Sequence, residues 1–144
     1  MNFLDNLKNR FLKEQNKIKK IKEKKDDAER SFKSKFEEIV HDEQFQIDLN
    51  DLMAFFNKEN KANQKRYKCG YHIEGTKLQF YRNGYSFSLG YISLEKENNI
   101  IVVGDYTFPE HTTWKFNLKD MKRAQKKFLE IITQNMAKDE PDCT

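Results

Sequence analysis

Residues 1–40 carry apolar side chains at a seven-residue spacing, the repeat that lets one helix present a continuous apolar stripe. Between residues 1 and 66 the chain contains no glycine and no proline, so neither strong helix breaker interrupts the pattern. The pattern predicts a single helix over about residues 2–40. We call its apolar positions the heptad stripe: Leu4, Leu7, Phe11, Ile18, Ile21, Ala28, Phe32 and Ile39.

Three polar residues, Glu14, Lys25 and Lys35, also occupy stripe positions. Polar residues there fix register or partner choice at some cost in stability. A parallel homodimer would bring Lys25 against Lys25, whereas an antiparallel pair or a single helix avoids this repulsion. We therefore expect either antiparallel pairing or contact of the last apolar residues with the protein's own sheet. Those residues are Phe32, Phe36 and Ile39.

A second, short amphipathic helix is predicted after a break at residues 41–46. Asp48 can cap its N-terminus, and Asp51 adds a negative charge to its first turn. Residues 57–66 contain no helix breaker, so they either extend this helix or link it to the following segment. The expected apolar face consists of Leu49, Leu52, Met53, Phe55 and Phe56.

From residue 67 the apolar period changes to two, which predicts β-strands. Residues 74–77 fit a two-residue turn with Gly75 first, and Asn83-Gly84 is a strong hairpin sequence. Counting outward from both turns predicts the facing residues, because a slip of one residue would scramble the apolar layer. The predicted pairs are Ile73 with Leu78, Tyr71 with Phe80, Phe80 with Phe87, and Leu78 with Leu89.

The third predicted strand continues through residues 91–94, and residues 95–99 turn the chain. An uninterrupted apolar run at residues 100–103 predicts a fourth strand that is buried on both faces. Residues 112–116 fit a fifth strand, after which Asn117 with Asp120 can cap a final helix. Its expected buried face consists of Met121, Ala124, Phe128, Ile131 and Ile132.

These elements predict an α+β fold with a long N-terminal helix and a second short helix, followed by a four- to five-stranded antiparallel meander sheet packed by a C-terminal helix. Residues 1–40 would form a basic, heptad-patterned helical arm. Residues 47–138 would form one compact α+β domain, and residues 139–144 a frayed tail.

Positive charge is concentrated near the N-terminus, although the whole chain carries only +4. We call residues 8–25 the basic segment, in which Glu14 and Glu23 are the acidic residues. Lysine predominates over arginine, so nucleic-acid binding through this segment would be electrostatic, salt-sensitive and weakly selective. The candidate nucleic-acid-binding residues are Lys8, Arg10, Lys13, Lys17, Lys19, Lys20, Lys22, Lys24 and Lys25.

Catalytic and cofactor motifs are absent from the sequence. It contains no glycine-rich phosphate loop, no paired Cys-x-x-Cys, no His-x-x-x-His and no nucleophile elbow, so we expect no cofactor and no metal. Cys69 and Cys143 fit no disulfide framework, and no apolar run resembles a signal peptide or membrane span. A cytoplasmic protein is therefore expected, and abundant Lys, Asn and Ile suggest an AT-rich genome.

Polar residues gather on the expected outer face of the sheet, where His72, Lys77 and Tyr81 suggest a metal-independent ribonuclease by general acid–base design. A solvated face of a one-sided sheet explains the same residues. The order of the elements resembles that of small ribonuclease toxins of the RelE and ParE type, and this resemblance brings no catalytic residue with it. The face contains Lys68, His72, Glu74, Lys77, Gln79, Tyr81, Ser86 and Ser88.

Three functions follow as hypotheses. The leading one is a non-enzymatic module whose basic helix contacts nucleic acid or a nucleoprotein. The second is a protein-interaction or inhibitor module, of mobile-element or phage accessory type, that uses the stripe for homodimerisation or partner docking. The third is the ribonuclease. The candidate partner-binding residues for the second are Leu4, Leu7, Phe11, Ile18 and Ile21.

Overall fold

A computed structural model describes residues 2–65, 68–82, 88–95, 98–105 and 112–138. The chain forms two compact units, Met1–Ser34 and Lys35–Thr144. Its helices are α1 (Phe3–Val40), α2 (Glu43–Ala62) and α3 (Met121–Ala137), with a 3₁₀ turn at Leu118–Asp120. Its strands are β1 (Gly70–Glu74), β2 (Lys77–Tyr81), β3 (Ser88–Glu95), β4 (Ile100–Asp105) and β5 (Thr112–Asn117). The predicted α+β class is confirmed.

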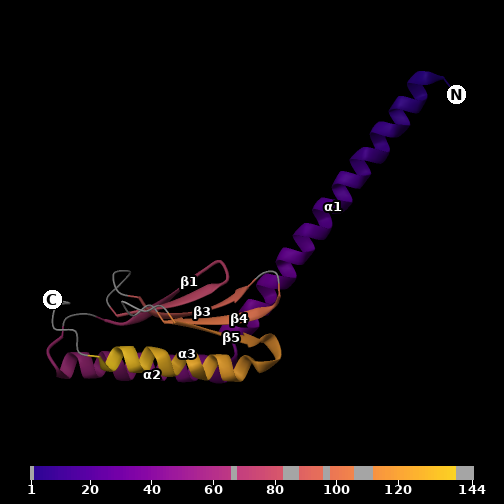
Figure 1. Cartoon of the computed structure of the whole chain (residues 1–144). Coiled ribbons are helices and arrows are strands. Elements are labelled where there is room, and N and C mark those ends of the chain that lie inside the picture. Colours follow the sequence, from indigo (N-terminus) through magenta and orange to yellow (C-terminus); the bar gives the residue numbers. More distant parts are fainter. Residues whose placement is uncertain (1, 66–67, 83–87, 96–97, 106–111, 139–144) are drawn as a thin grey trace. The chain divides into compact units, whose positions relative to one another are not determined.

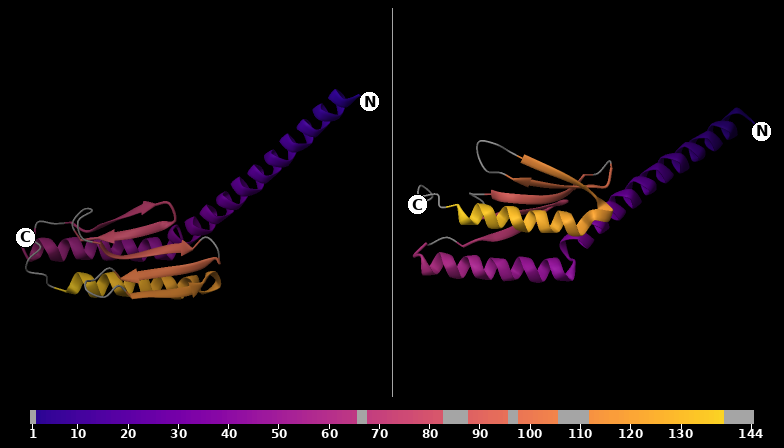
Figure 2. Two further views of the ribbon diagram at one scale, coloured as in Figure 1. Left: turned by 45° about the horizontal axis from the view of Figure 1, so that its top comes forward. Right: turned by 60° about the horizontal axis from the view of Figure 1, so that its bottom comes forward.

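The second unit is built on a five-stranded antiparallel sheet whose strands follow chain order from β1 to β5. Helices α2 and α3 cover one face of this sheet (Figure 1, Figure 2). The core lies between the two layers, where Phe56 of α2 meets Phe80 of β2 edge to face, and the rings of Phe45 of α2 and Phe128 of α3 contact each other at a tilt. The opposite face of the sheet carries most of its polar side chains.

The end of α1 belongs to this core. Phe36, Ile39 and Val40 are buried, as expected for contact with the protein's own domain, whereas Phe32 is half-exposed. In the last turn of α1 the carbonyl of Ile39 accepts a hydrogen bond of 2.7 Å from the buried Gln125 side chain of α3. A carbonyl without a helical partner is thereby satisfied inside the protein.

The predicted break at residues 41–46 is wrong, because α2 already begins at Glu43. Asp42, not Asp48, caps the helix, and its carboxylate accepts a hydrogen bond from the Phe45 amide. The helix continues through Ala62, so most of residues 57–66 extend it, the first of the two predicted alternatives. The earlier start places Phe45 in the core, and Phe55 faces solvent instead of the core.

The β1–β2 register is as predicted: Ile73 faces Leu78 and Tyr71 faces Phe80. Gly75 adopts a φ of +60° in the connecting turn, a conformation that glycine reaches without a steric penalty.

The β2–β3 register is not the predicted one, since Leu78 faces Ile92 instead of Leu89. Tyr81 pairs with Ser88, and the register shifts between Phe80 and Tyr81. The predicted pair of Phe80 with Phe87 is wrong, because Phe80 faces Gly90; Phe87 itself lies outside the described residues. The observed register points Ile92 and Leu94, both buried, toward the helices.

Strand β4 and helix α3 complete the core. Ile101, Val102 and Val103 are all buried, so side chains on both faces of β4 are buried, as predicted. Ala124, Phe128, Ile131 and Ile132 of α3 are buried as predicted, but Met121 is only half-buried. Asp120 occupies the N-cap position of α3 without a capping hydrogen bond from its side chain.

Candidate functional site

The basic segment lies on the exposed surface of α1. All nine of its basic side chains are exposed, and the described residues include no ion-pair partner for any of them. Nine basic and two acidic residues give the segment a formal charge of +7, whereas the whole chain carries +4. The recorded ion pair of the first unit joins Arg30 to Asp27, C-terminal to the segment. This surface therefore presents concentrated positive charge to solvent.

Four of these lysines share one side of the helix. Lys13, Lys17, Lys20 and Lys24 are spaced by four, three and four residues, the spacing that aligns side chains along an α-helix. We call them the lysine row. Because the helix rises 1.5 Å per residue, the row is about 16 Å long. Its ammonium groups form a line of point charges.

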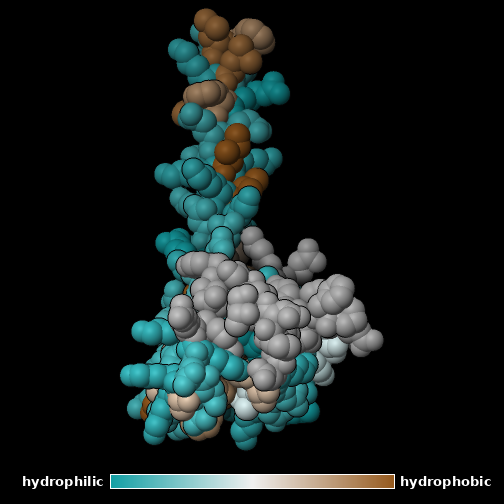
Figure 3. All heavy atoms as spheres, turned by 90° about the vertical axis from the view of Figure 1, so that its left-hand side faces the viewer, coloured by the Kyte–Doolittle hydropathy of each residue, from teal (hydrophilic) through white to brown (hydrophobic). Residues whose placement is uncertain are grey.

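The heptad stripe of the first unit is also exposed, with Phe11 61%, Ile18 65% and Ile21 66% accessible. Leu4 and Leu7 are exposed as well, as are Phe3 and Leu12, which the heptad pattern did not include. In Figure 3 the apolar side chains of this unit form patches between hydrophilic ones. Apolar side chains in such a row are typical of an association surface.

The structure brings only part of the proposed ribonuclease group together. The rings of His72 and Tyr81 are 6.4 Å apart between centroids, and the imidazole Nε2 lies 3.8 Å from a Glu74 carboxylate oxygen. The Lys77 ammonium lies instead over the ring of Tyr91, 4.7 Å from its centroid. Two serines are expected on this face. Ser88 of β3 lies opposite Tyr81 of β2 in the strand register, and Ser86 lies outside the described residues.

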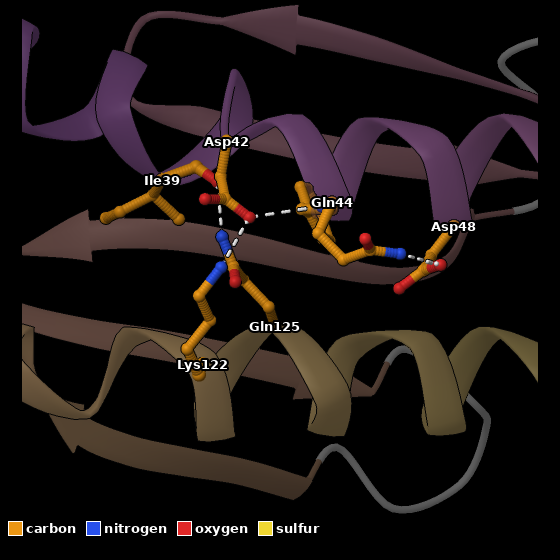
Figure 4. A network of polar contacts seen from close by, with 7 residues as sticks. Ile39, Asp42, Gln44, Asp48, Lys122 and Gln125 are labelled. Atoms are coloured by element: carbon orange, nitrogen blue, oxygen red, sulfur yellow. Dashed lines mark hydrogen bonds and ion pairs between the residues drawn. The ribbon is translucent and has the colours of Figure 1, made fainter.

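A polar network joins the start of α2 to α3, and sequence reasoning missed it (Figure 4). The Lys122 ammonium donates to the Asp42 carboxylate at 2.8 Å, while the amide of Gln125 donates to the Ile39 carbonyl. The hydrogen bond from Lys122 holds the pKa of Asp42 below its ordinary value. Because these groups satisfy one another, the network stabilises the fold and leaves no reactive group poised for chemistry.

A second buried polar cluster lies at the C-terminal end of α3. Arg82 donates to the carbonyls of Asn135 and Lys138, and the Asn135 amide donates to the Leu89 carbonyl and the Asp105 carboxylate. Arg82 and Asn135 are buried. Their donors satisfy carbonyl groups at the helix end and on β3, so they too have a structural role.

Three further features matter for function: whether the described residues hold a metal-binding cluster, a reactive cysteine or a membrane-spanning helix. No group of three His, Cys, Asp or Glu side chains among them could hold a metal ion. Burial raises the pKa of the Cys69 thiol to about 11, so this cysteine stays protonated and unreactive at neutral pH. None of the helices described is long and apolar enough to cross a membrane.

Comparisons with known proteins add no relative. No protein-family model matches the chain, and no curated protein or solved structure is significantly similar to it.

Proposed function

We propose that this protein is a non-enzymatic binding module whose basic segment contacts the phosphates of nucleic acid, free or within a nucleoprotein. One observation carries the proposal: nine basic side chains are exposed on a single stretch of α1 and have no acidic partner among the described residues. Unpaired lysines lose little by moving from solvent to a phosphate. A cytoplasmic location, where nucleic acid is accessible, suits this function.

The contact would be electrostatic. Lysine presents a mobile point charge, whereas reading of bases favours the planar fork of arginine, and the basic segment has only Arg10. Binding is therefore driven by release of condensed counterions and shows little sequence preference. The lysine row is the best candidate for the contact, because its four ammonium groups can approach one phosphate backbone together.

The test is the salt dependence of binding to a labelled DNA duplex and a labelled RNA. If the lysine row neutralises about four phosphates, log K should fall with log salt concentration with a slope of about −4. Replacing Lys13, Lys17, Lys20 and Lys24 by Gln should weaken binding and make the slope shallower by about the same amount.

A matched control removes the same charge from the second unit: Lys58, Lys61, Lys119 and Lys126, all exposed, are replaced by Gln. This control should retain the affinity and slope of the wild type. Equal losses in the two variants would show that overall charge, not the lysine row, drives the binding. Affinity that does not change with salt would contradict the proposal.

The exposed stripe favours a second candidate function, a protein-interaction module. Isolated helices in water are marginal, and stripe residues with more than half of their surface exposed gain free energy from any partner that covers them. The nature of that partner is developed below. Ribonuclease activity remains a third hypothesis. The lysine proposed for it, Lys77, lies over the ring of Tyr91.

A further inference from the structure

We infer that the heptad stripe of the first unit pairs with the same stripe of a second copy, antiparallel, in the register that places Glu14 of each copy opposite Lys25 of the other. This inference deepens the interaction function proposed above and does not depend on nucleic-acid binding. The surface involved is the exposed stripe of the unit Met1–Ser34.

The exposed apolar stripe gains free energy when a partner buries it, and its heptad spacing favours a helix as that partner. Leu7, Phe11, Ile18 and Ile21 follow one another at four, seven and three residues, with Glu14 at the stripe position between Phe11 and Ile18, and all four are more than 40% exposed. Side chains at this spacing fit into the holes of a second helix with the same spacing. The segment from residue 7 to residue 32 is about 38 Å long, well above the length at which a helix pair can associate.

The two polar stripe residues of the first unit, Glu14 and Lys25, determine the orientation. In a parallel pair Glu14 would face Glu14 and Lys25 would face Lys25, so both polar layers of the seam would repel. In an antiparallel pair residues at the two core positions of the heptad face each other, and Glu14 occupies one position while Lys25 occupies the other. Opposite charges can then meet in both layers.

The same two residues also determine the register. With Glu14 opposite Lys25, Ile18 faces Ile21, Phe11 faces Ala28 and Leu7 faces Phe32 of the second copy, so the other layers between residues 7 and 32 are apolar. Leu4 falls opposite Lys35, at the outer end of the seam. A shift of one heptad in one direction would place Glu14 opposite Ile18. A shift in the other direction would place it opposite Phe32. Each shift would bury an unpaired charge, which is costly.

The flanking positions connect this seam to the lysine row. On one side of the seam Lys8 lies near Glu29 of the second copy, a favourable pair. On the other side Lys17 lies near Lys24 of the second copy, and both belong to the lysine row. The dimer would thus bring lysines of the two copies close together. A polyanion bound there would relieve their repulsion.

The pairing cannot occur within one helix. Glu14 and Lys25 are separated by three turns, so their Cα atoms are about 16 Å apart along the axis of α1, too far for a direct ion pair. Any coupling between the two charges therefore reports contact between copies.

A charge swap tests the inference. We would measure the dimer dissociation constant of the full chain by sedimentation equilibrium, without nucleic acid. Glu14→Lys places like charges in both polar layers, and so does Lys25→Glu. Each should raise the dissociation constant about 100-fold, because two symmetric pairs are lost at roughly tenfold each. The double variant Glu14→Lys/Lys25→Glu restores opposite charges and should return to within about threefold of the wild type.

The matched controls are Glu23→Lys and Lys33→Glu, which make the same charge changes at exposed positions outside the stripe. Their dissociation constants should stay within about threefold of the wild type, and circular dichroism should show unchanged helix content in all variants. A monomeric wild type, single variants that dimerise normally, or a double variant that does not recover would each overturn the inference. Because the assay contains no nucleic acid, failure here leaves the salt-dependence test of phosphate binding unaffected.

Discussion

Asp42 illustrates how one side chain sets an element boundary. Its carboxylate caps α2 through the Phe45 amide at 3.1 Å and accepts a hydrogen bond from Lys122 at 2.8 Å. A capping aspartate is visible in the sequence, but the sequence also contains Asp48 a short distance further on. What distinguishes Asp42 is a lysine brought to it by α3, 80 residues away along the chain.

Replacing Asp42 by Ala should lower the free energy of unfolding by about 1 kcal/mol, since the cap and the ion pair are both lost. Asp42→Asn keeps a capping oxygen and should cost less. Because the folded pKa lies below the ordinary value of 3.8, the charged carboxylate contributes stability above that pH and loses it as pH falls through the folded value.

Urea unfolding of the wild type and the Asn variant at several pH values checks this. The difference in their unfolding free energies should be constant near neutral pH and should shrink in acid. A difference that does not depend on pH would show that the charge of Asp42 contributes nothing.

At the scale of elements, the pairing of β3 with β4 depends on a glycine. Gly104 faces Tyr91, and a Cβ at Gly104 would come within 2.0 Å of the tyrosine ring. The ring therefore lies directly over the glycine backbone, with the Lys77 ammonium above it. The sequence shows the glycine, but only the register shows which aromatic ring covers it.

Gly104→Ala should destabilise the protein by about 1–3 kcal/mol, because the Tyr91 ring must move to make room for the methyl group. Gly70→Ala is the matched control in the same sheet, since nothing lies within 4 Å of a Cβ at that position. Thermal unfolding of both variants gives the comparison. In a Tyr91→Ala background the Gly104 substitution should cost less, and an equal cost there would rule out the ring as the cause.

At the scale of the whole molecule, the chain divides within α1. Met1–Ser34 forms one unit, while Phe36, Ile39 and Val40 at the end of the same helix are buried in the core of the other. A continuous helix in the sequence is therefore not one structural unit. Its heptad stripe continues across the boundary, but the residues on either side of it have different environments.

Two truncations test this division. A chain of residues 35–144 should keep the unfolding free energy of the second unit within about 1 kcal/mol, because its core is intact. A chain of residues 41–144 loses three fully buried apolar side chains and should be destabilised by more than about 5 kcal/mol. Chemical unfolding followed by circular dichroism distinguishes them, and equal stability of the two chains would contradict the boundary.

The sequence alone determined the fold class, the order of the elements, the buried apolar face of α3 and the β1–β2 register, in which Gly75 specifies a tight turn. It also determined both candidate surfaces, since charge and heptad spacing are local properties. Tertiary structure decided the β2–β3 register, because the observed register buries Ile92 and Leu94 against the helices, whereas Asn83-Gly84 alone predicted a different one. It also decided the roles of Lys122, Gln125 and Asn135, because their partners lie far away in the sequence and meet them only after the chain has folded.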